Sequence, residues 1–204
     1  MDEIISNKNK KKKIQTMSVG YRIFERKIPA KQISIFLSGP IGDPIDYVEM
    51  IYKIKQATEN DIIYIHLNTN GGNLETGVQI LNAIHATSAH VITSLESTAY
   101  SLGTLLFLSG NEVQLHENSL MMFHSFSAVM IGKGHEMTSE LETLNKWYNK
   151  MMKKICVPFL SIEEVEQIIN GKDIWMETDE IKRRLNRMAK DEQVEKRVLK
   201  RNKN

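Results

Sequence analysis

The sequence contains one cysteine, four prolines and no long apolar run, and each shortage removes a class of protein. A single cysteine, Cys156, excludes an internal disulfide and a zinc cluster built on cysteines. The longest apolar stretches, such as residues 105–108, fall far short of the roughly 20 residues that span a bilayer, so no membrane partner is expected. Hydrophobic residues at 41% and charged residues at 25% are ordinary for a globular protein.

The start of the chain lacks the pattern of a secretory signal, because Asp2 and Glu3 are followed by lysines and not by an apolar run. Together with the lone cysteine, this favours a reducing compartment. We therefore expect the protein to be cytoplasmic, in the host cell if the protein is viral, or to lie in the stroma or matrix of an organelle.

Positive charge is concentrated at the two ends of the chain. Residues 1–13 hold five lysines against two acidic residues, residues 181–204 hold ten lysines and arginines against three, and acidic residues prevail between them. Basic tails contact nucleic acid or acidic proteins, or are simply solvated. No aromatic residue lies among the basic ones of either tail, so we expect solvated ends and no nucleic-acid partner.

The rest of the chain alternates strand-like and helix-like segments, which predicts an α/β fold with a largely parallel sheet. Asp43 and Pro44 are typical of a helix start, and Ser161 and Glu164 form a capping-box pattern. Apolar residues from Met137 to Ile155 recur every three or four residues and predict one long amphipathic helix. The expected strands are residues 33–37, 62–67, 91–95, 113–115, 120–123 and 174–176. The expected division of the chain is a flexible basic segment 1–17, one domain over 18–187 and a basic tail 188–204.

Two turns between strand and helix carry residues suited to acyl-transfer chemistry. Gly71 and Gly72 follow a buried strand. Glycines at this place leave backbone N–H groups that can bind an oxyanion or a phosphate, or they simply form a tight turn. Ser101 lies between a strand and a short helix, and the residues near it are small. This position suits a nucleophile, and it equally suits an ordinary serine that caps the helix.

Two further polar residues fit the same chemistry. His124 ends an apolar strand, where it serves as a general base or as a core-edge histidine bonded to backbone. Asp173 precedes an apolar segment, where it orients an imidazole or belongs to a turn. The six histidines show no metal-ligand spacing, so neither a metal nor another cofactor is expected.

As an ordered set, these residues resemble the proteolytic subunit of the Clp protease (ClpP). That family carries Asn-x-Pro-Gly-Gly, Ala-Ser-Met-Gly, Met-x-His-Gln-Pro and Asp-Arg-Phe-Leu-like segments. The separations between Gly71, Ser101, His124 and Asp173 are 30, 23 and 49 residues, close to those of the family. The resemblance covers residues 32–186, and the corresponding segments here are 68–72, 100–103, 121–126 and 173–176.

The resemblance implies a crotonase-like fold of repeated β-β-α units with a protruding handle helix, and an ATP-dependent serine endopeptidase. Unfolded polypeptides would be cleaved inside two stacked heptameric rings fed by a Clp-type ATPase. Ser101 would be the nucleophile, His124 the base, and Asp173 the residue that orients it. The oxyanion hole would use Gly71 and Leu102, and the substrate would contact Gly72, Ser125 and Phe126.

The sequence departs from the family beside the site, since Asn70 replaces a proline and Ser125-Phe126 replaces Gln-Pro. These departures and the composition would suit a viral or organellar relative. Two alternatives remain: a crotonase-like enzyme acting on acyl-CoA thioesters, and a catalytically silent subunit of a mixed ring. Ser101, His124 and Asp173 in family order disfavour both, because neither alternative needs all three.

Overall fold

The computed structural model of the chain describes residues 29–201, with side chains over residues 29–190. The expected basic segment 1–17 lies outside the described residues. Within them the strands are β1 (Gln32–Ser38), β2 (Ile62–Thr69), β3 (His90–Tyr100), β4 (Glu112–Leu115), β5 (Leu120–Phe123) and β6 (Ile174–Glu177). The helices are η1 (Pro44–Tyr47), α1 (Val48–Gln56), α2 (Leu74–Ala86), α3 (Leu102–Phe107), α4 (Gly134–Cys156), α5 (Ile162–Ile169) and α6 (Thr178–Arg201).

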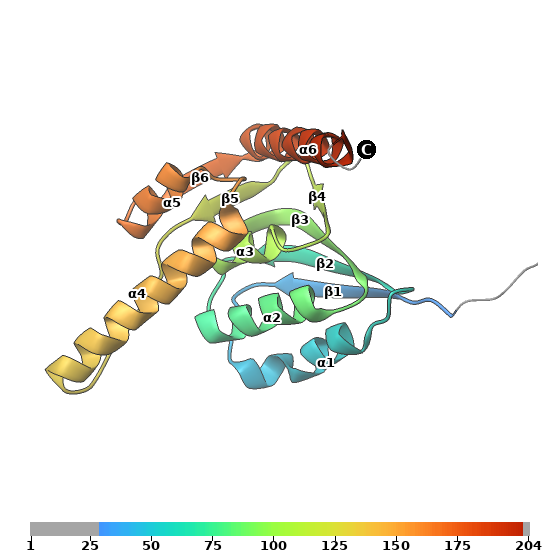
Figure 1. Cartoon of the computed structure of the whole chain (residues 1–204). Coiled ribbons are helices and arrows are strands. Elements are labelled where there is room, and N and C mark those ends of the chain that lie inside the picture. Colours follow the sequence, from blue (N-terminus) through green and yellow to red (C-terminus); the bar gives the residue numbers. More distant parts are fainter. Residues whose placement is uncertain (1–28, 202–204) are drawn as a thin grey trace, which may run out of the picture.

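The described strands form one mixed sheet in the order β1-β2-β3-β5-β6, with β4 also paired to β3 (Figure 1). All neighbours are parallel except β5 and β6, which run antiparallel. β3 is long enough to pair first with β4, through residues 92–95, and then with β5, through residues 98–100. The α/β expectation is confirmed, and β3 and β5 end together at one edge of the sheet.

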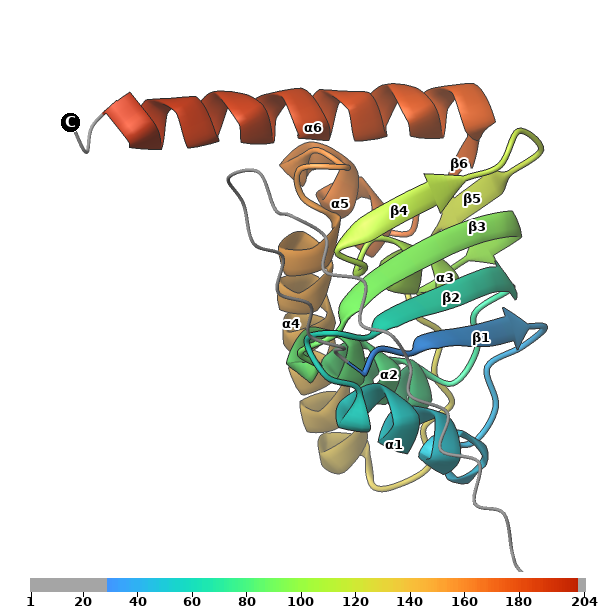
Figure 2. The same ribbon diagram turned by 90° about the vertical axis from the view of Figure 1, so that its right-hand side faces the viewer.

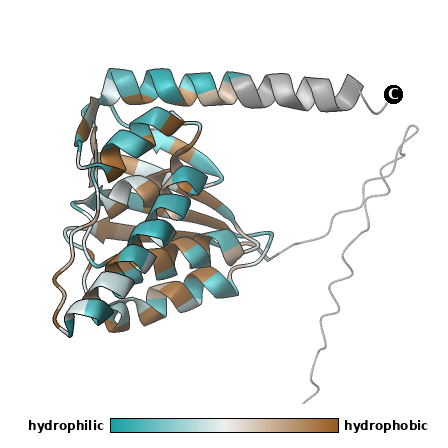
Figure 3. Ribbon diagram, turned by 60° about the vertical axis from the view of Figure 1, so that its left-hand side comes forward, coloured by the Kyte–Doolittle hydropathy of each residue, from teal (hydrophilic) through white to brown (hydrophobic). Residues whose placement is uncertain are grey.

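The core lies between the sheet and the helices on one of its faces (Figure 1). In β2 the side chains of Ile63, Ile65 and Leu67 are fully buried, whereas the intervening Tyr64 and His66 are only half-buried. Successive side chains of a strand point to opposite faces, so this alternation marks the covered face of the sheet. The helices carry hydrophilic and hydrophobic residues together, as amphipathic helices do (Figure 3).

The start of the first helix differs from its expected form. A helical segment does begin at Pro44 after Asp43, but as a 3₁₀ turn, and the side chain of Asp43 makes no capping hydrogen bond. The N–H of Asp46 already donates to the backbone carbonyl of Asp43 at 3.1 Å, which leaves the carboxylate without its usual donor. The predicted capping box of Ser161 and Glu164 is present at the start of α5.

α4 matches the long helix expected from the apolar spacing, and its outer part projects from the body (Figure 1). Near its C-terminal end Tyr148, Met152 and Cys156 are buried in this subunit. Leu141 and Trp147, in contrast, are 44% and 40% exposed. The C-terminal part of α4 therefore belongs to the core, Trp147 lines a groove between α4 and α2, and Leu141 is exposed farther toward the N-terminal end of the helix.

α6 runs past the body as one continuous helix (Figure 2). Its first turns pack on the core through Ile181, Leu185 and Met188. The expected boundary between residues 187 and 188 therefore lies inside a helix. Within residues 29–201, no helix combines the length and apolar character needed to cross a membrane.

Candidate active site

A cleft of about 520 Å³ opens where β3 and β5 end. Ser101 and His124, which are 23 residues apart in the sequence, both line it. Gly72, Leu102, Leu105, Phe126 and Tyr148 are among the other lining residues. The parallel pairing of β3 with β5 causes this meeting, because Tyr100, the last residue of β3, pairs with Met122, and β5 ends one residue later at Phe123. Ser101 and His124 are the residues that follow the two strands.

Ser101 sits at the sharp turn from β3 into α3. Its φ of 55° is positive, and among the described residues it is the only non-glycine residue with such a backbone. Its N–H donates to the carbonyl of Met122 at 2.7 Å, and its own carbonyl accepts from the N–H and the hydroxyl of Thr104 at 3.0 and 2.6 Å. These bonds hold the strained turn in place. Because the side chain makes no capping hydrogen bond, the interpretation as an ordinary capping serine is not supported.

His124 follows directly after β5 and is half-buried. Its backbone carbonyl accepts a hydrogen bond from the Tyr148 hydroxyl at 3.0 Å. Within the described part of the chain, neither its imidazole nor the Ser101 hydroxyl has a hydrogen-bond partner. Both groups therefore face a shared cleft with their hydrogen-bonding capacity unused, a common state for an enzyme without substrate.

The two glycines occupy different positions relative to the cleft. Gly71 is buried, and its N–H donates to the Thr69 hydroxyl at 3.1 Å, so that N–H is already engaged. Gly72 is exposed and lines the cleft beside Leu102. Leu102 is the first residue of α3, where N–H groups lack partners within the helix. The N–H of Gly71 is therefore engaged by Thr69, whereas Gly72 and Leu102 both line the cleft.

Close packing of three chain segments explains why glycines occur here. A Cβ atom on Gly71, whose φ is +80°, would lie 2.8 Å from the Tyr100 carbonyl oxygen and 2.9 Å from Ser101 Cβ. A Cβ atom on Gly72 would overlap the backbone of Ile41, with which Gly72 forms an isolated bridge. Only glycine allows these backbones to approach so closely.

Asp173 is exposed and is not among the residues that line the cleft. The last antiparallel pair of β5 and β6 joins Phe123 to Ile174, so Asp173 and His124 are the next residues on the two chains. The fold therefore brings Asp173 to the strand end that carries His124, but no hydrogen bond joins the two side chains.

The expected substrate contacts divide in a similar way. Gly72 and Phe126 line the cleft, whereas Ser125 does not. Tyr148 also lines the cleft, although the sequence places it only within the apolar repeat from Met137 to Ile155. Burial raises the pKa of Tyr148 well above its usual range. The helical spacing that put Tyr148 in the stripe says nothing about a hydroxyl bond to a residue 24 positions away.

Acidic, histidine and cysteine side chains of the described residues do not gather in threes at positions suited to a metal ion. Glu96, which is not among the residues that line the cleft, lies 2.6 Å from His66 and 3.6 Å from His116. The polar side chains that line the cleft include those of Ser101, His124, Glu75 and Tyr148.

Comparison with known proteins agrees with this geometry. The Clp protease family model matches residues 15–184. The ATP-dependent Clp protease proteolytic subunit of Streptococcus suis (strain 98HAH33) is 29% identical over 172 residues, which cover 78% of this chain and 84% of that protein. The corresponding subunit 1 of Salinibacter ruber is 23% identical over 167 residues, covering 78% of this chain and 70% of that protein. Because the family model matches most of the length of this chain, the chain belongs to the Clp protease family and is a protease.

Proposed function

We propose that the chain is a serine endopeptidase in which Ser101 is the nucleophile and His124 the general base. One observation carries the proposal: an uncapped, strained Ser101 shares a cleft with His124. A positive φ costs about 1–3 kcal/mol at a non-glycine residue, and such strain is concentrated at functional sites. An ordinary capping serine has no need of it.

The proposed reaction follows from these groups. The Ser101 hydroxyl attacks the peptide carbonyl while His124 takes its proton. The N–H groups of Leu102 and Gly72 stabilise the oxyanion of the tetrahedral intermediate. His124 then returns the proton to the leaving amine, and an acyl ester on Ser101 remains. Water, activated by His124, hydrolyses this ester and regenerates the hydroxyl.

We assign Asp173 the role of orienting the imidazole of His124. The assignment is supported by the β5–β6 register, which ends one residue short of both side chains. In the proposed active form, the Asp173 carboxylate accepts a hydrogen bond from the imidazole N–H of His124. The Asp173→Asn variant should then retain the fold and lose kcat by about 10³-fold to 10⁴-fold, the scale typical of a triad carboxylate.

The proposal also covers assembly and partners. The relatives are named as proteolytic subunits of an ATP-dependent protease. We propose that this chain likewise forms two stacked heptameric rings, fed with unfolded polypeptides by a Clp-type ATPase in the cytoplasm or an organelle. The exposed Leu141 on α4 suits contact with another copy. Negative-stain images of the purified protein should show seven-fold rings.

The decisive experiment uses Ser101→Ala in a peptide-cleavage assay together with labelling by a fluorophosphonate probe. Because the hydroxyl forms the covalent intermediate, we expect turnover to fall by about 10³-fold to 10⁶-fold and labelling to disappear. Ser34→Ala is the matched control, since Ser34 is exposed on β1. The His124→Ala variant should lose about as much, and the double variant hardly more, because the two residues act as one unit.

Undiminished turnover by Ser101→Ala would overturn the assignment of the nucleophile. Binding of a CoA ester without any labelling would favour the crotonase-like alternative. A folded wild-type chain that neither reacts nor cleaves would favour a catalytically silent subunit.

A further inference from the structure

We infer that Tyr148 is a positioning residue for the base: its hydroxyl fixes the backbone of His124 relative to Ser101. The inference rests on the proposed function, because it assigns a role within that reaction. Tyr148 comes from α4, an element that contributes none of the three residues expected to carry out catalysis.

The pattern of strand hydrogen bonds shows what this hydroxyl replaces. Carbonyl groups two residues apart on a strand point to the same side, so in a continued β5 the carbonyls of Met122 and His124 would both be bonded by β3. The Met122 carbonyl is bonded by the N–H of Ser101 at 2.7 Å. Beyond Ser101 the chain turns away into α3, so β3 supplies no donor for the His124 carbonyl. The Tyr148 hydroxyl takes that place at 3.0 Å.

The surroundings of Tyr148 keep its hydroxyl in position. The residue is 5% exposed, and its ring packs against the edge of Phe126 with ring centroids 5.1 Å apart. The next buried residues on the same face of α4 are Met152 and Cys156, so Tyr148 lies on the part of the helix that is anchored in the core. Burial raises the pKa of the Tyr148 hydroxyl, so it stays protonated as a donor throughout the neutral pH range.

Geometry of this kind matters because proton transfer requires close alignment. A displacement of about 1 Å in a catalytic group costs up to about 100-fold in rate. His124 is the first residue past β5, and strand pairing alone fixes the chain only as far as Phe123. Tyr148 therefore extends the alignment of this strand by one residue, up to the one that carries the imidazole.

The test is Tyr148→Phe, which removes the hydroxyl and keeps the ring. Peptide turnover is normalised to sites titrated with a fluorophosphonate, so that misfolded molecules are not counted. We expect kcat per titrated site and the labelling rate to fall about 10-fold to 100-fold, with KM changed by less than about threefold. Tyr52→Phe on α1 is the matched control, since its side chain is 63% exposed and distant from the cleft, and its rates should equal those of the wild type.

The outcomes separate the two ideas. If the wild type turns over in a Ser101-dependent manner and Tyr148→Phe has the same kcat per site, the positioning role is wrong and the proposed function stands. If the wild type shows no Ser101-dependent turnover, the positioning role of Tyr148 and the proposed function are both wrong. Should Tyr148→Phe give no soluble protein, Phe126→Leu is measured instead. It keeps the hydroxyl but removes the aromatic edge that holds the ring, and an unchanged kcat per site there would also overturn the inference.

Discussion

At the scale of single residues, the turn at Ser101 depends on a neighbour that has no side chain. Gly71 is buried directly against Tyr100 and Ser101, and its backbone has a φ of +80°. Gly39 has nearly the same backbone, with a φ of +88°, but a Cβ atom there would meet nothing within 4 Å. The two glycines share the same conformational demand and differ in what surrounds them. Substituting each of the two glycines therefore distinguishes the effect of backbone strain, which both variants share, from the effect of displacing Ser101, which only the Gly71 variant has.

The Gly71→Ala variant should lower kcat/KM by more than about tenfold per folded molecule, because the new methyl group pushes on the Ser101 turn. Gly39→Ala should lose about 1 kcal/mol of stability from its positive φ and keep its activity. Denaturant unfolding and peptide cleavage, measured on both variants, check this. Equal activity in the two variants would mean that the Ser101 turn tolerates displacement.

At the scale of elements, Arg184 joins α6 to α5. Its guanidinium binds both carboxylate oxygens of Glu164 at 2.7 Å, binds Glu180 at 2.6 Å and donates to the Phe159 carbonyl at 3.1 Å. The arginine side chain is only 11% exposed, so solvent screens these contacts weakly. Glu164 also closes the capping box of α5. Arg184 therefore links the first turns of α6 to the start of α5, in addition to the apolar contacts of α6 with the core.

The acid stability of the protein should depend on this pair. The hydrogen bonds from Arg184 lower the pKa of Glu164 from its usual 4.5 to about 2. A lowered carboxyl pKa means that the stabilisation is complete above about pH 4.5 and is lost as the pH falls toward 2. At pH 7, Glu164→Gln should cost about 1–2 kcal/mol, since the pair is partly solvated.

The measurement is denaturant unfolding of the wild type and Glu164→Gln from pH 7 to pH 2. The difference between them should shrink below pH 4.5. Lys53→Met, which breaks the exposed pair with Glu49, is the control and should change nothing measurable. A gap between wild type and Glu164→Gln that stays constant down to pH 2 would show that the ion pair is not the source of the stability.

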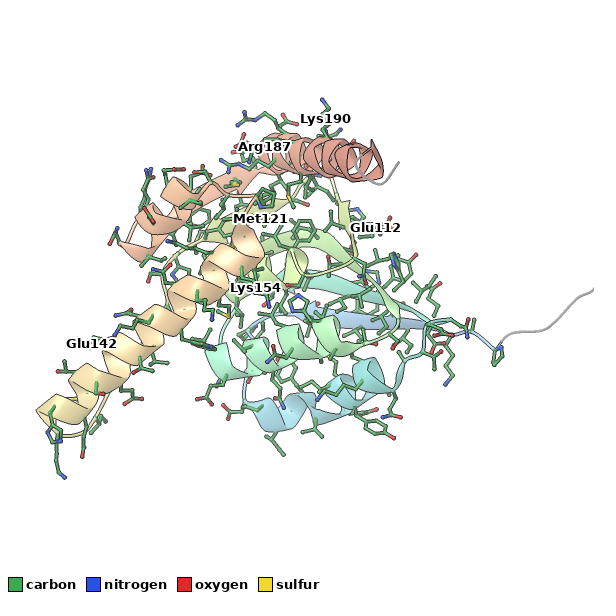
Figure 4. The ribbon with its side chains drawn as sticks, viewed as in Figure 1. Glu112, Met121, Glu142, Lys154, Arg187 and Lys190 are labelled. Atoms are coloured by element: carbon green, nitrogen blue, oxygen red, sulfur yellow. The ribbon has the colours of Figure 1, made fainter. Side chains whose placement is uncertain are left out.

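At the scale of the whole molecule, α4 serves two purposes that the apolar spacing does not distinguish. Met151 packs against the core and lines a groove between α4 and α2. Leu144, two residues after Glu142 on the same helix, is only half-buried. Figure 4 shows Glu142 on the projecting part of α4 and Lys154 where the helix meets the body. The same stripe therefore belongs to the subunit at one end and is available to a partner copy at the other.

Leu144→Glu should leave the unfolding free energy of the subunit nearly unchanged and reduce particle size in light scattering, because a carboxylate at a contact between copies is costly to bury. Met151→Glu should instead destabilise the subunit itself. Glu142→Gln, a neutral change on the exposed side, should alter neither property. Full-size particles with full activity in Leu144→Glu would show that this part of α4 faces solvent in the assembly.

Much of the fold and the chemistry of the candidate site could be predicted from local pattern. Apolar spacing predicted α4, a buried run predicted β2, and Ser161 with Glu164 predicted the start of α5. These features depend on neighbours a few residues apart, so the sequence displays them directly. The order of glycines, serine, histidine and aspartate likewise indicated the protease family that the family model identifies.

What only the tertiary structure decided depends on directions and on distant partners. Gly71 and Gly72 are adjacent in the sequence, yet one N–H is engaged by Thr69 and the other residue lines the cleft. The bond from Tyr148 to the carbonyl of His124 joins a helix to a strand end 24 residues away. Residue type and spacing determine which groups are present. Only the packing of strands against helices determines which way each N–H, hydroxyl and carbonyl points, because a hydrogen bond depends on the angle as well as on the distance.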